Sequence, residues 1–433
     1  MRIIKADAVE FGDFFRQLRQ RGGAFTPDLL TTVAEIIRDV AARGDAALFD
    51  YTAKFDRYEL SAATVEVTDE EKKAALSLVR PEDLDVISLA AERIEKYHKN
   101  QTAQSWLAAN EEGVEVGQRI LPLERIGIYA PGGKAVYPST ILMAAIPARI
   151  AGVQEIILVT PSKDGILNPL IAAAAKVSGV NRIFKIGGAQ AIAALAYGTK
   201  TIPRVDKIVG PGNAYVAAAK KLVFGQVDID MIAGPSEVVV IADKTARASF
   251  AAADLLAQLE HDEMAAAVLF TPDENLAHEV SREVERQMKT LSRTAIMEKS
   301  EAGYGAIIIT ADIDQAIDLS NIFAPEHLEL MVEDPAGALS KVRNAGSVFL
   351  GSFTPEALGD YMAGTNHILP TEGTARFSSP LGVYDFVKRM SVLRFTPAAL
   401  GKLGHKTAHF ARMEGLDAHA NSVDVRLNDA KKG

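Results

Sequence analysis

An adjacent pair, Glu326-His327, combines the two residue types best suited to moving protons near neutral pH. Histidine titrates in that range without help, and a carboxylate beside it can take a proton from water. The pair follows Ala324-Pro325 and directly precedes an apolar run, so we expect it in a loop where a strand begins. Because an isolated Glu-His dipeptide is common, the pair alone does not define a site.

A long segment from Leu358 to Pro380 follows a predicted strand but has neither helical nor strand periodicity. It contains Asp360, His367 and Arg376 among glycines, threonines and serines, and its apolar side chains argue against disorder. A structural Ω-loop with incidental polar groups is one interpretation. We favour an active-site loop, because long irregular segments inside compact domains are usually functional.

Any metal site in this chain must use nitrogen and oxygen ligands, since the sequence contains no cysteine. Gln258 and His261 are three residues apart in a predicted helix, so they share one face and can converge on one ion. Glutamine is an uncommon zinc ligand, and a solvated helix end also explains the pair. The lack of cysteine further means that aldehyde oxidation here cannot pass through an enzyme thiohemiacetal.

The elements that must position these residues alternate between strand and helix from residue 118 to residue 243. Apolar, β-branched runs separated by alanine-rich helical stretches are typical of a parallel, doubly wound sheet covered on both faces. The predicted strands are Arg125–Tyr129, Glu155–Thr160, Asn181–Ile186, Lys207–Val209 and Glu237–Ala242.

Glycine-rich turns follow three of these strands. They are Pro131-Gly132-Gly133, Gly187-Gly188 and Gly210-Pro211-Gly212-Asn213. Ligands bind at the carboxyl ends of parallel strands, where helix N-termini offer free amide donors to an anion. Gly210 and Gly212 begin like a dinucleotide fingerprint, but Tyr215 occupies its third glycine position. Asp228 and Asp230 lie near the usual acidic offset, so the turns indicate a nucleotide site without the complete fingerprint.

A second α/β sheet with fewer strands is predicted from the alternation that resumes after residue 251 and ends with a strand at Ser347–Leu350. Residues 1 to about 120 are expected to be mostly helical, including a helix from Pro81 towards His98 with a solvated histidine. Towards the C-terminus, the pattern predicts helices, among them Tyr384–Met390, and a short strand at Ser422–Leu427. This tail is too short to form its own core, so it must pack on the rest of the chain or on another subunit.

The length, net charge and hydrophobicity of the chain limit the class of protein. A chain of 433 residues exceeds one compact core, so we expect two or more domains. The formal net charge is −9 and no basic stripe appears, which argues against a nucleic-acid partner. The first residues lack the apolar run of a signal peptide, and no apolar window is long enough to span a bilayer. We therefore expect a cytoplasmic protein with no membrane partner.

Eight stretches, in order and over essentially the whole chain, resemble the zinc-dependent, NAD-linked L-histidinol dehydrogenase family. They read RIGIYAPGGKAVYPST, KIGGAQAIAALAYGT, VGPGNAYV, IDMIAGPSEVVVIAD, LAQLEHD, FAPEHLEL, LGDYMAGTNHILPTEGTARFSS and EGLDAHANSVDVR. Any one of them can arise by chance, whereas eight in register are highly specific. The sequence departs mildly from the family's pattern at MAGTNH and SSPLGVYDF. Pro380 and Tyr384, in the second of these stretches, can alter the substrate pocket.

The resemblance implies an α/β fold with two Rossmann-like, doubly wound parallel-sheet domains, one inserted in the other. It also implies a homodimer whose small helical terminal segments are exchanged between subunits. The implied parts are an N-terminal helical segment (1–24), a discontinuous first α/β domain with the zinc and catalytic residues (25–128 and 238–381), an inserted NAD-binding domain (129–237) and a C-terminal arm reaching the partner's active site (382–433).

The resemblance also implies roles for individual residues. One Zn²⁺ per subunit would be held by Gln258, His261, Asp360 and His419, the last coming from the partner subunit. His327 would act as the base towards the alcohol, and Glu326 would activate water. The substrate would contact Ser236, His367 and Glu414 in addition to His327 and the four zinc ligands. Tyr129, Gln190 and Asn213 would contact NAD.

The implied reaction is the four-electron oxidation of L-histidinol through L-histidinaldehyde to L-histidine with two NAD, the last steps of histidine biosynthesis. Three alternatives remain open. A dehydrogenase of the same fold can act on another alcohol, such as a sulfonated propanediol. A zinc hydrolase using Glu326 on metal-bound water leaves the glycine turns unexplained. A non-catalytic nucleotide-binding module does not account for Glu326-His327.

Overall fold

The computed structural model describes residues 1–22, 25–132 and 136–429, which fall into two compact units. The first unit is made of residues 1–101 and 123–386, and the second combines residues 102–122 with the chain from residue 387 onward. The C-terminal arm predicted over 382–433 is therefore completed by an internal segment. Among the described residues, no helix is both long and apolar enough to cross a membrane.

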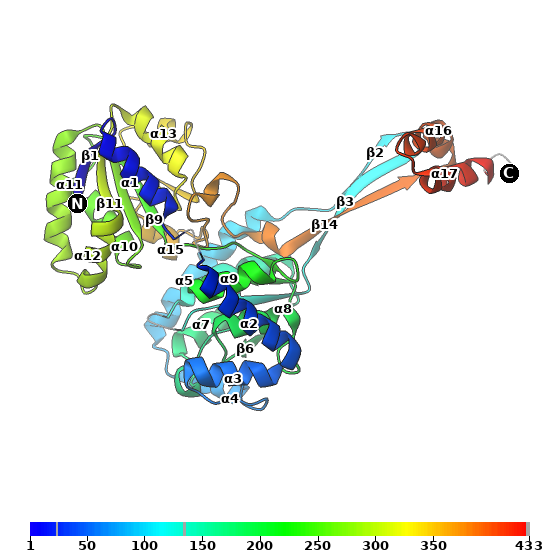
Figure 1. The fold of residues 1–433 in the computed structure, drawn as a ribbon, viewed down its shortest axis with the longest axis horizontal. Coiled ribbons are helices and arrows are strands. Elements are labelled where there is room, and N and C mark those ends of the chain that lie inside the picture. The colour runs from blue at the N-terminus through cyan, green and yellow to red at the C-terminus, as the bar shows by residue number, and fades with distance from the viewer. Residues whose placement is uncertain (23–24, 133–135, 430–433) are drawn as a thin grey trace. The chain divides into compact units, whose positions relative to one another are not determined.

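A six-stranded parallel sheet in the first unit has the order β1-β11-β10-β9-β12-β13 (Figure 1). Its strands are β1 (Arg2–Lys5), β9 (Glu237–Ala242), β10 (Ala266–Thr271), β11 (Gly305–Ile309), β12 (His327–Met331) and β13 (Ser347–Leu350). The first 24 residues were predicted to be helical, but they begin with β1, which pairs with β11. Local periodicity could not reveal this strand, because its partner lies some 300 residues away.

Helices cover both faces of this sheet. Val238 and Val240 of β9 face a cluster that includes side chains of α10 (Ala248–Leu259), α11 (Glu274–Met288) and α12 (Thr294–Tyr304). Val239 and Ile241 face the opposite cluster, with α1 (Val9–Gln20), α13 (Ile313–Phe323) and α14 (Pro335–Leu339). Alternate residues of one strand thus supply both cores, which explains the continuously apolar strands.

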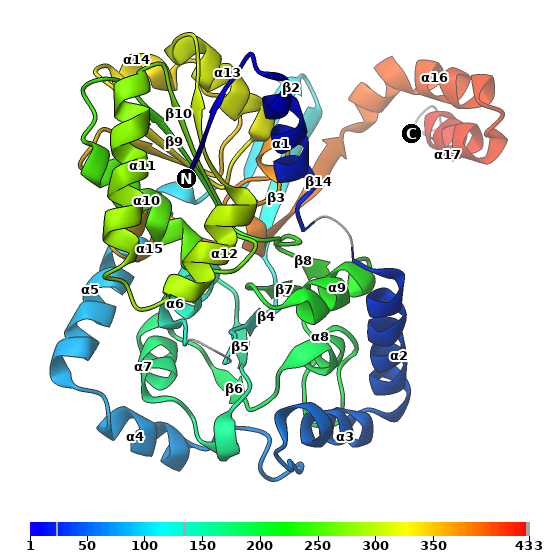
Figure 2. The same cartoon turned by 60° about the vertical axis from the view of Figure 1, so that its left-hand side comes forward.

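A five-stranded parallel sheet in the same unit has the order β6-β5-β4-β7-β8 (Figure 2). Its strands are β4 (Arg125–Tyr129), β5 (Glu155–Val159), β6 (Arg182–Phe184), β7 (Lys207–Val209) and β8 (Asp228–Ile229). Counted within the sheet this order is 3-2-1-4-5, and the strands from β9 to β13 repeat it in the other sheet. The predicted α/β class with two parallel sheets is confirmed. The strand Glu237–Ala242, grouped from the sequence with this sheet, belongs to the other one, which has more strands and not fewer as predicted.

The helices on the five-stranded sheet come from two parts of the chain. One face carries α6 (Pro138–Ala151) and α7 (Pro169–Ser178) together with α4 (Asp69–Ser77) and α5 (Pro81–His98). The other carries α8 (Gly188–Tyr197) and α9 (Ala214–Val223) with α2 (Pro27–Arg43) and α3 (Asp45–Asp56). Residues 27–98, grouped from the sequence with the other sheet, therefore pack here, because an apolar helix stripe does not specify which sheet it covers.

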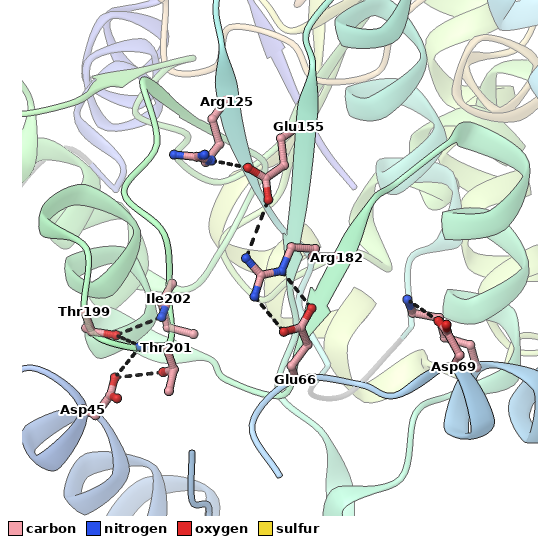
Figure 3. Close-up of polar contacts among 10 residues, drawn as sticks. Asp45, Glu66, Asp69, Arg125, Glu155, Arg182, Thr199, Thr201 and Ile202 are labelled. Carbon is pink, nitrogen blue, oxygen red and sulfur yellow. Dashed lines mark hydrogen bonds and ion pairs between the residues drawn. The ribbon is translucent and has the colours of Figure 1, made fainter. Parts of the chain in front are cut away.

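Polar contacts also tie this N-terminal layer to the five-stranded sheet, as Figure 3 shows. Arg182 of β6 donates from Nε and Nη2 to the Glu66 carboxylate at 2.8 and 2.6 Å, and it also pairs with Glu155 of β5. Asp45, the first residue of α3, accepts a hydrogen bond from the Thr201 hydroxyl at 2.8 Å. His98 at the end of α5 was predicted to be solvated but is fully buried, with Nδ1 2.8 Å from Gln101 Oε1.

The second unit is built on an antiparallel ribbon that local patterns did not predict. Its strands are β2 (Trp106–Glu111), β3 (Val114–Pro122) and β14 (Val387–Phe395), and two helices follow, α16 (Pro397–Met413) and α17 (Asp417–Asp429). The helix predicted over 384–390 is therefore wrong: a 3-10 turn (Val383–Phe386) leads into β14. The strand predicted over 422–427 is helical, and its Leu427 packs against Gly404 of α16.

Candidate active site

The Glu326-His327 pair lies at the amino edge of the six-stranded sheet. Helix α13 ends at Phe323, Ala324 turns through a left-handed conformation (φ 56°), and His327 is the first residue of β12. β12 lies between β9 and β13, which places His327 beside Val238 and Ser347. Both side chains of the pair are buried, with 6% of Glu326 and 3% of His327 exposed.

The main chain of one residue, Glu237, holds both members of the pair. Its N–H donates to Glu326 Oε2 at 3.1 Å, and its carbonyl oxygen lies 3.3 Å from His327 Nδ1. The carbonyl can only accept, so it favours the tautomer with the proton on Nδ1. His327 Nε2 is buried and has no hydrogen-bond partner among the described residues. Nε2 is therefore the ring nitrogen that is available to exchange a proton with a bound molecule.

Two further carboxylates approach His327 from α15 (Glu356–Tyr361). Glu356 Oε1 lies 3.8 Å from Nδ1, and Asp360 Oδ1 lies 3.7 Å from Nε2. The sequence predicted Asp360 as a site residue but not Glu356. Their spacing of four was a usable signal, since residues four apart share a helix face. It was lost because the segment from Leu358 onward was interpreted as irregular.

Burial and neighbouring charge shift the proton affinity of these groups. Burial raises the pKa of Glu326 to about 7 and that of Glu356 to about 8, although His327 acts against both shifts. Burial alone would depress the pKa of His327, but the surrounding carboxylates, Glu356 foremost, raise it well above its ordinary value. A carboxyl group with a pKa near 7 is suited to act as a base in neutral solution.

A cluster of potential metal ligands adjoins the pair. Ligand atoms of His261, Glu356 and Asp360 all lie within 4.8 Å of one another. Gln258 is fully buried in α10, one turn before His261, and neither its amide nitrogen nor its amide oxygen has a partner among the described residues. A buried amide without partners costs stability unless a ligand satisfies it. These nitrogen and oxygen donors fit a divalent cation such as zinc.

The remaining predicted substrate and metal residues are divided between the two units. His367 Nδ1 is 3.1 Å from the Asp360 carbonyl oxygen, and its Nε2 is 3.4 Å from the Thr140 hydroxyl of α6. Ser236 is half-buried and directly precedes β9. Glu414, at the end of α16, and His419, in α17, belong to the second unit, where both are exposed.

Two of the predicted NAD residues meet at the carboxyl edge of the five-stranded sheet. Tyr129 ends β4, and its hydroxyl accepts a hydrogen bond from the Gly188 N–H at 3.2 Å, where α8 begins. Gln190 lies in the first turn of α8, buried, with both amide atoms unpartnered among the described residues. A helix N-terminus next to an unsatisfied buried amide suits an anionic, hydrogen-bonding ligand.

The turn after β7 is the third component of this edge. Gly210 has a φ of 108°, and a Cβ there would lie 2.2 Å from the Tyr129 carbonyl oxygen, so only glycine permits this close approach. Asn213 caps α9 by accepting from the Tyr215 and Val216 amides. Asp230 was noted from the sequence for its acidic offset; its carboxylate is buried and paired with Lys220 and the Gly210 N–H. Gly133 of the first predicted glycine turn lies outside the described residues.

The fold and the site together define an α/β protein with a buried Glu-His pair beside a cluster of potential metal ligands. Comparison with known proteins gives its family. A sequence model of the histidinol dehydrogenase family matches residues 19–427, and the chain belongs to that family, which consists of oxidoreductases.

Individual relatives agree over their full lengths. Histidinol dehydrogenase of Syntrophotalea carbinolica is 53% identical over 99% of this chain and 100% of its own length. That of Geobacter sulfurreducens is 52% identical, again over 99% and 100%. The crystal structure of histidinol dehydrogenase from Elizabethkingia anophelis matches with a TM-score of 0.94 at 40% identity, covering 100% of this chain and 99% of that one.

Proposed function

We propose that this chain catalyses the NAD-dependent, four-electron oxidation of L-histidinol to L-histidine through L-histidinaldehyde, the last steps of histidine biosynthesis. Membership of the histidinol dehydrogenase family supports the substrate. The observation that carries the chemistry is that one main-chain unit, Glu237, holds Glu326 and His327 together in a buried site. The proposed place of action is the cytoplasm.

In the proposed site, Gln258, His261 and Asp360 hold a zinc ion, with His419 of the partner subunit as the fourth ligand. Bound zinc would supply a Lewis acid that orients the imidazole and amine of the substrate. The orphaned amide of Gln258 and the grouping of His261 with Asp360 support this assignment. Glu356 belongs to the same cluster, and its position beside His327 suits a group that keeps the imidazole basic. Ser236, His367 and Glu414 complete the proposed substrate contacts.

In the first half-reaction, His327 takes the proton of the alcohol at Nε2. This nitrogen is the unpartnered one, and the Glu237 carbonyl keeps the other ring proton on Nδ1. His327 and Glu356 are buried, and this low-dielectric surrounding strengthens the interaction of the imidazolium with the Glu356 carboxylate. The product of this step is the aldehyde.

In the second half-reaction, Glu326 takes a proton from the water that adds to the aldehyde carbon. The resulting hydrate is oxidised to the carboxylic acid, with His327 again accepting a hydroxyl proton. Because the chain has no cysteine, the hydrate is the route to the acid that these side chains can support. With Oε2 fixed by the Glu237 N–H, Glu326 is held in place for this role.

The five-stranded sheet and its helices form the proposed NAD-binding domain. Its strand order matches the first five strands of the dinucleotide-binding fold, and ligands of such sheets lie where that order reverses, here between β4 and β7. Tyr129, Gln190 and Asn213 surround that point. Bound NAD would accept the hydride in each half-reaction.

We further propose a homodimer in which the second unit completes the partner's site. The second unit exposes many large apolar side chains, which a chain of this kind covers by association. They include Trp106, Leu393, Phe395, Phe410 and Met413. Two proposed site residues, Glu414 and His419, lie in this unit, and exchange between subunits would bring them to a neighbour's zinc.

Initial rates with a panel of substrates test the proposed function. With zinc and NAD present, L-histidinol is expected to give a kcat/KM far above that of a sulfonated propanediol. A preference for the sulfonated alcohol would identify a different dehydrogenase of the same fold. Product formation from an ester or amide without NAD would instead indicate a hydrolase.

A further inference from the structure

Arg21 links the N-terminal segment to the residue that holds the catalytic pair. It follows α1 directly, and its side chain is almost completely buried. Nη2 contacts the Glu237 carboxylate and also donates to the Pro235 carbonyl oxygen at 2.9 Å. One guanidinium nitrogen thus binds both the side chain and the main chain of the loop that leads into β9.

Glu237 has two separate roles in this arrangement. Its carboxylate binds Arg21, while its N–H and carbonyl oxygen contact Glu326 and His327 at 3.1 and 3.3 Å. A displacement of the Glu237 main chain therefore moves both catalytic side chains together. Among the described residues, Arg21 reaches the pair through Glu237 and makes no hydrogen bond or ion pair with either Glu326 or His327.

Glu372 contacts the same loop and lies beside the end of α1, since a Cβ at Gly22 would lie 2.4 Å from Glu372 Oε1 and 2.6 Å from Pro235 Cδ. Glu372 has a φ of 55°, a conformation that is costly for a side chain other than glycine or asparagine. Its carboxylate fits only because residue 234 is glycine, since a Cβ there would lie 2.2 Å from Glu372 Cδ. Gly234 also donates to the Thr371 hydroxyl at 2.7 Å. The end of α1 and residues 371 and 372 therefore contact the same loop.

The buried ion pair itself is poorly suited to stabilising the fold. Arg21 Nε and Nη1, together with Glu237 Oε1, are buried without hydrogen-bond partners among the described residues. A buried pair with unsatisfied groups is often no more stable than an apolar replacement, because desolvation offsets the attraction. The pair does, however, fix the position of residues 235–237, because Arg21 binds both the Pro235 carbonyl oxygen and the Glu237 carboxylate.

We propose that Arg21 is a positioning residue for catalysis, which holds the Glu237 main chain so that Glu326 and His327 adopt their working geometry. The inference rests on the roles proposed above for that pair. A displacement of about 1 Å at a reacting group can lower the rate about 10²-fold, so the arginine matters although it contacts no substrate.

The experiment compares Arg21→Ala, Arg21→Lys and the control Arg19→Ala, which removes an exposed arginine from the same helix. For Arg21→Ala, kcat with L-histidinol is expected to fall about 10²-fold while KM changes less than about threefold, because the zinc ligands are intact. Arg21→Lys keeps one of the two contacts and is expected to lie between. Millimolar guanidinium should restore part of the Arg21→Ala activity, whereas urea, which is planar but uncharged, should not.

A second readout does not depend on turnover. The ring signals of His327, assigned in labelled protein by their loss in His327→Asn, should shift in Arg21→Ala and return with guanidinium. If the wild type forms no NADH from L-histidinol, the proposed function fails, and these signals still decide the positioning role. If Arg21→Ala is too unstable to study, Arg21→Lys is judged by the same signals. Unchanged kcat and unchanged His327 signals in a folded Arg21 variant would overturn the inference.

Discussion

Replacing Glu326 with glutamine is expected to separate the two half-reactions. The amide oxygen of glutamine can still accept the Glu237 N–H that now lies 3.1 Å from Oε2, so the site keeps its shape. What is lost is the carboxylate that we propose as the base towards water. Oxidation of supplied L-histidinaldehyde should therefore suffer more than the oxidation of L-histidinol.

The size of the effect follows from the geometry. A positioned general base contributes about 10²- to 10⁴-fold, which corresponds to roughly 3–5 kcal/mol of transition-state free energy in the aldehyde step. In the alcohol step, His327 keeps the Glu356 and Asp360 carboxylates at 3.8 and 3.7 Å and stays basic. We expect that step to slow by less than about tenfold.

Single-turnover NADH formation from each substrate measures the two steps separately. Glu333→Gln, which removes an exposed carboxylate just after β12, is the control and should leave both rates unchanged. The melting temperature of Glu326→Gln should match the wild type, whereas Glu326→Ala should lose about 1–3 kcal/mol because the buried Glu237 N–H is left unpaired. Equal losses in both half-reactions of Glu326→Gln would refute the assignment of Glu326 to water.

Three further outcomes are expected. Gln258→Leu should raise the melting temperature of EDTA-treated protein, because it removes two unpartnered buried polar atoms, and should weaken zinc binding in a competition titration; unchanged zinc affinity would argue against this ligand. Glu326 and Glu356 have folded pKa values of about 7 and about 8 against an ordinary 4.5, so their stabilising contribution is complete below about pH 4.5 and is lost as pH rises to about 8. Thermal melts of zinc-free protein should therefore show falling stability over that range, less steeply in Glu356→Gln, and a rise would contradict the shifts. Finally, His327→Asn and His419→Asn should each be inactive alone, but co-expressed subunits should recover about one quarter of wild-type activity if sites are shared; no recovery would mean that each site is built within one chain.

The sequence predicted the sheets of this protein well because they are encoded locally. Continuously apolar runs such as Glu237–Ala242 and Glu155–Val159 are typical of strands buried on both faces, and both were found in parallel sheets. The strands β1 and β14 were missed because each pairs with residues far away in the chain, and the local β2-β3 hairpin was missed because its sequence does not alternate clearly between apolar and polar residues. Their short, half-polar sequences carry no period that identifies a partner.

The sequence predicted those residues of the candidate site that can be recognised by their chemical type and spacing. Glu326-His327, Asp360 and the Gln258/His261 spacing could be selected from the sequence, and the structure brings His261 and Asp360 into one cluster. Glu356 and Arg21 could not be selected, since their importance lies in a short helix and in a contact across 216 residues of chain. The supporting residues of a site depend on tertiary geometry more strongly than its reacting residues do.

The central claim is that one site, in which Glu326 and His327 are the bases and NAD is the oxidant, carries out the oxidation of both the alcohol and the aldehyde. The most direct measurement is the amount of NADH formed per L-histidinol consumed, with zinc present and the reaction followed to completion. Two equivalents of NADH with L-histidine as the product are expected. One equivalent with the aldehyde as the end product would contradict the claim, because it would leave Glu326 without a reaction to catalyse.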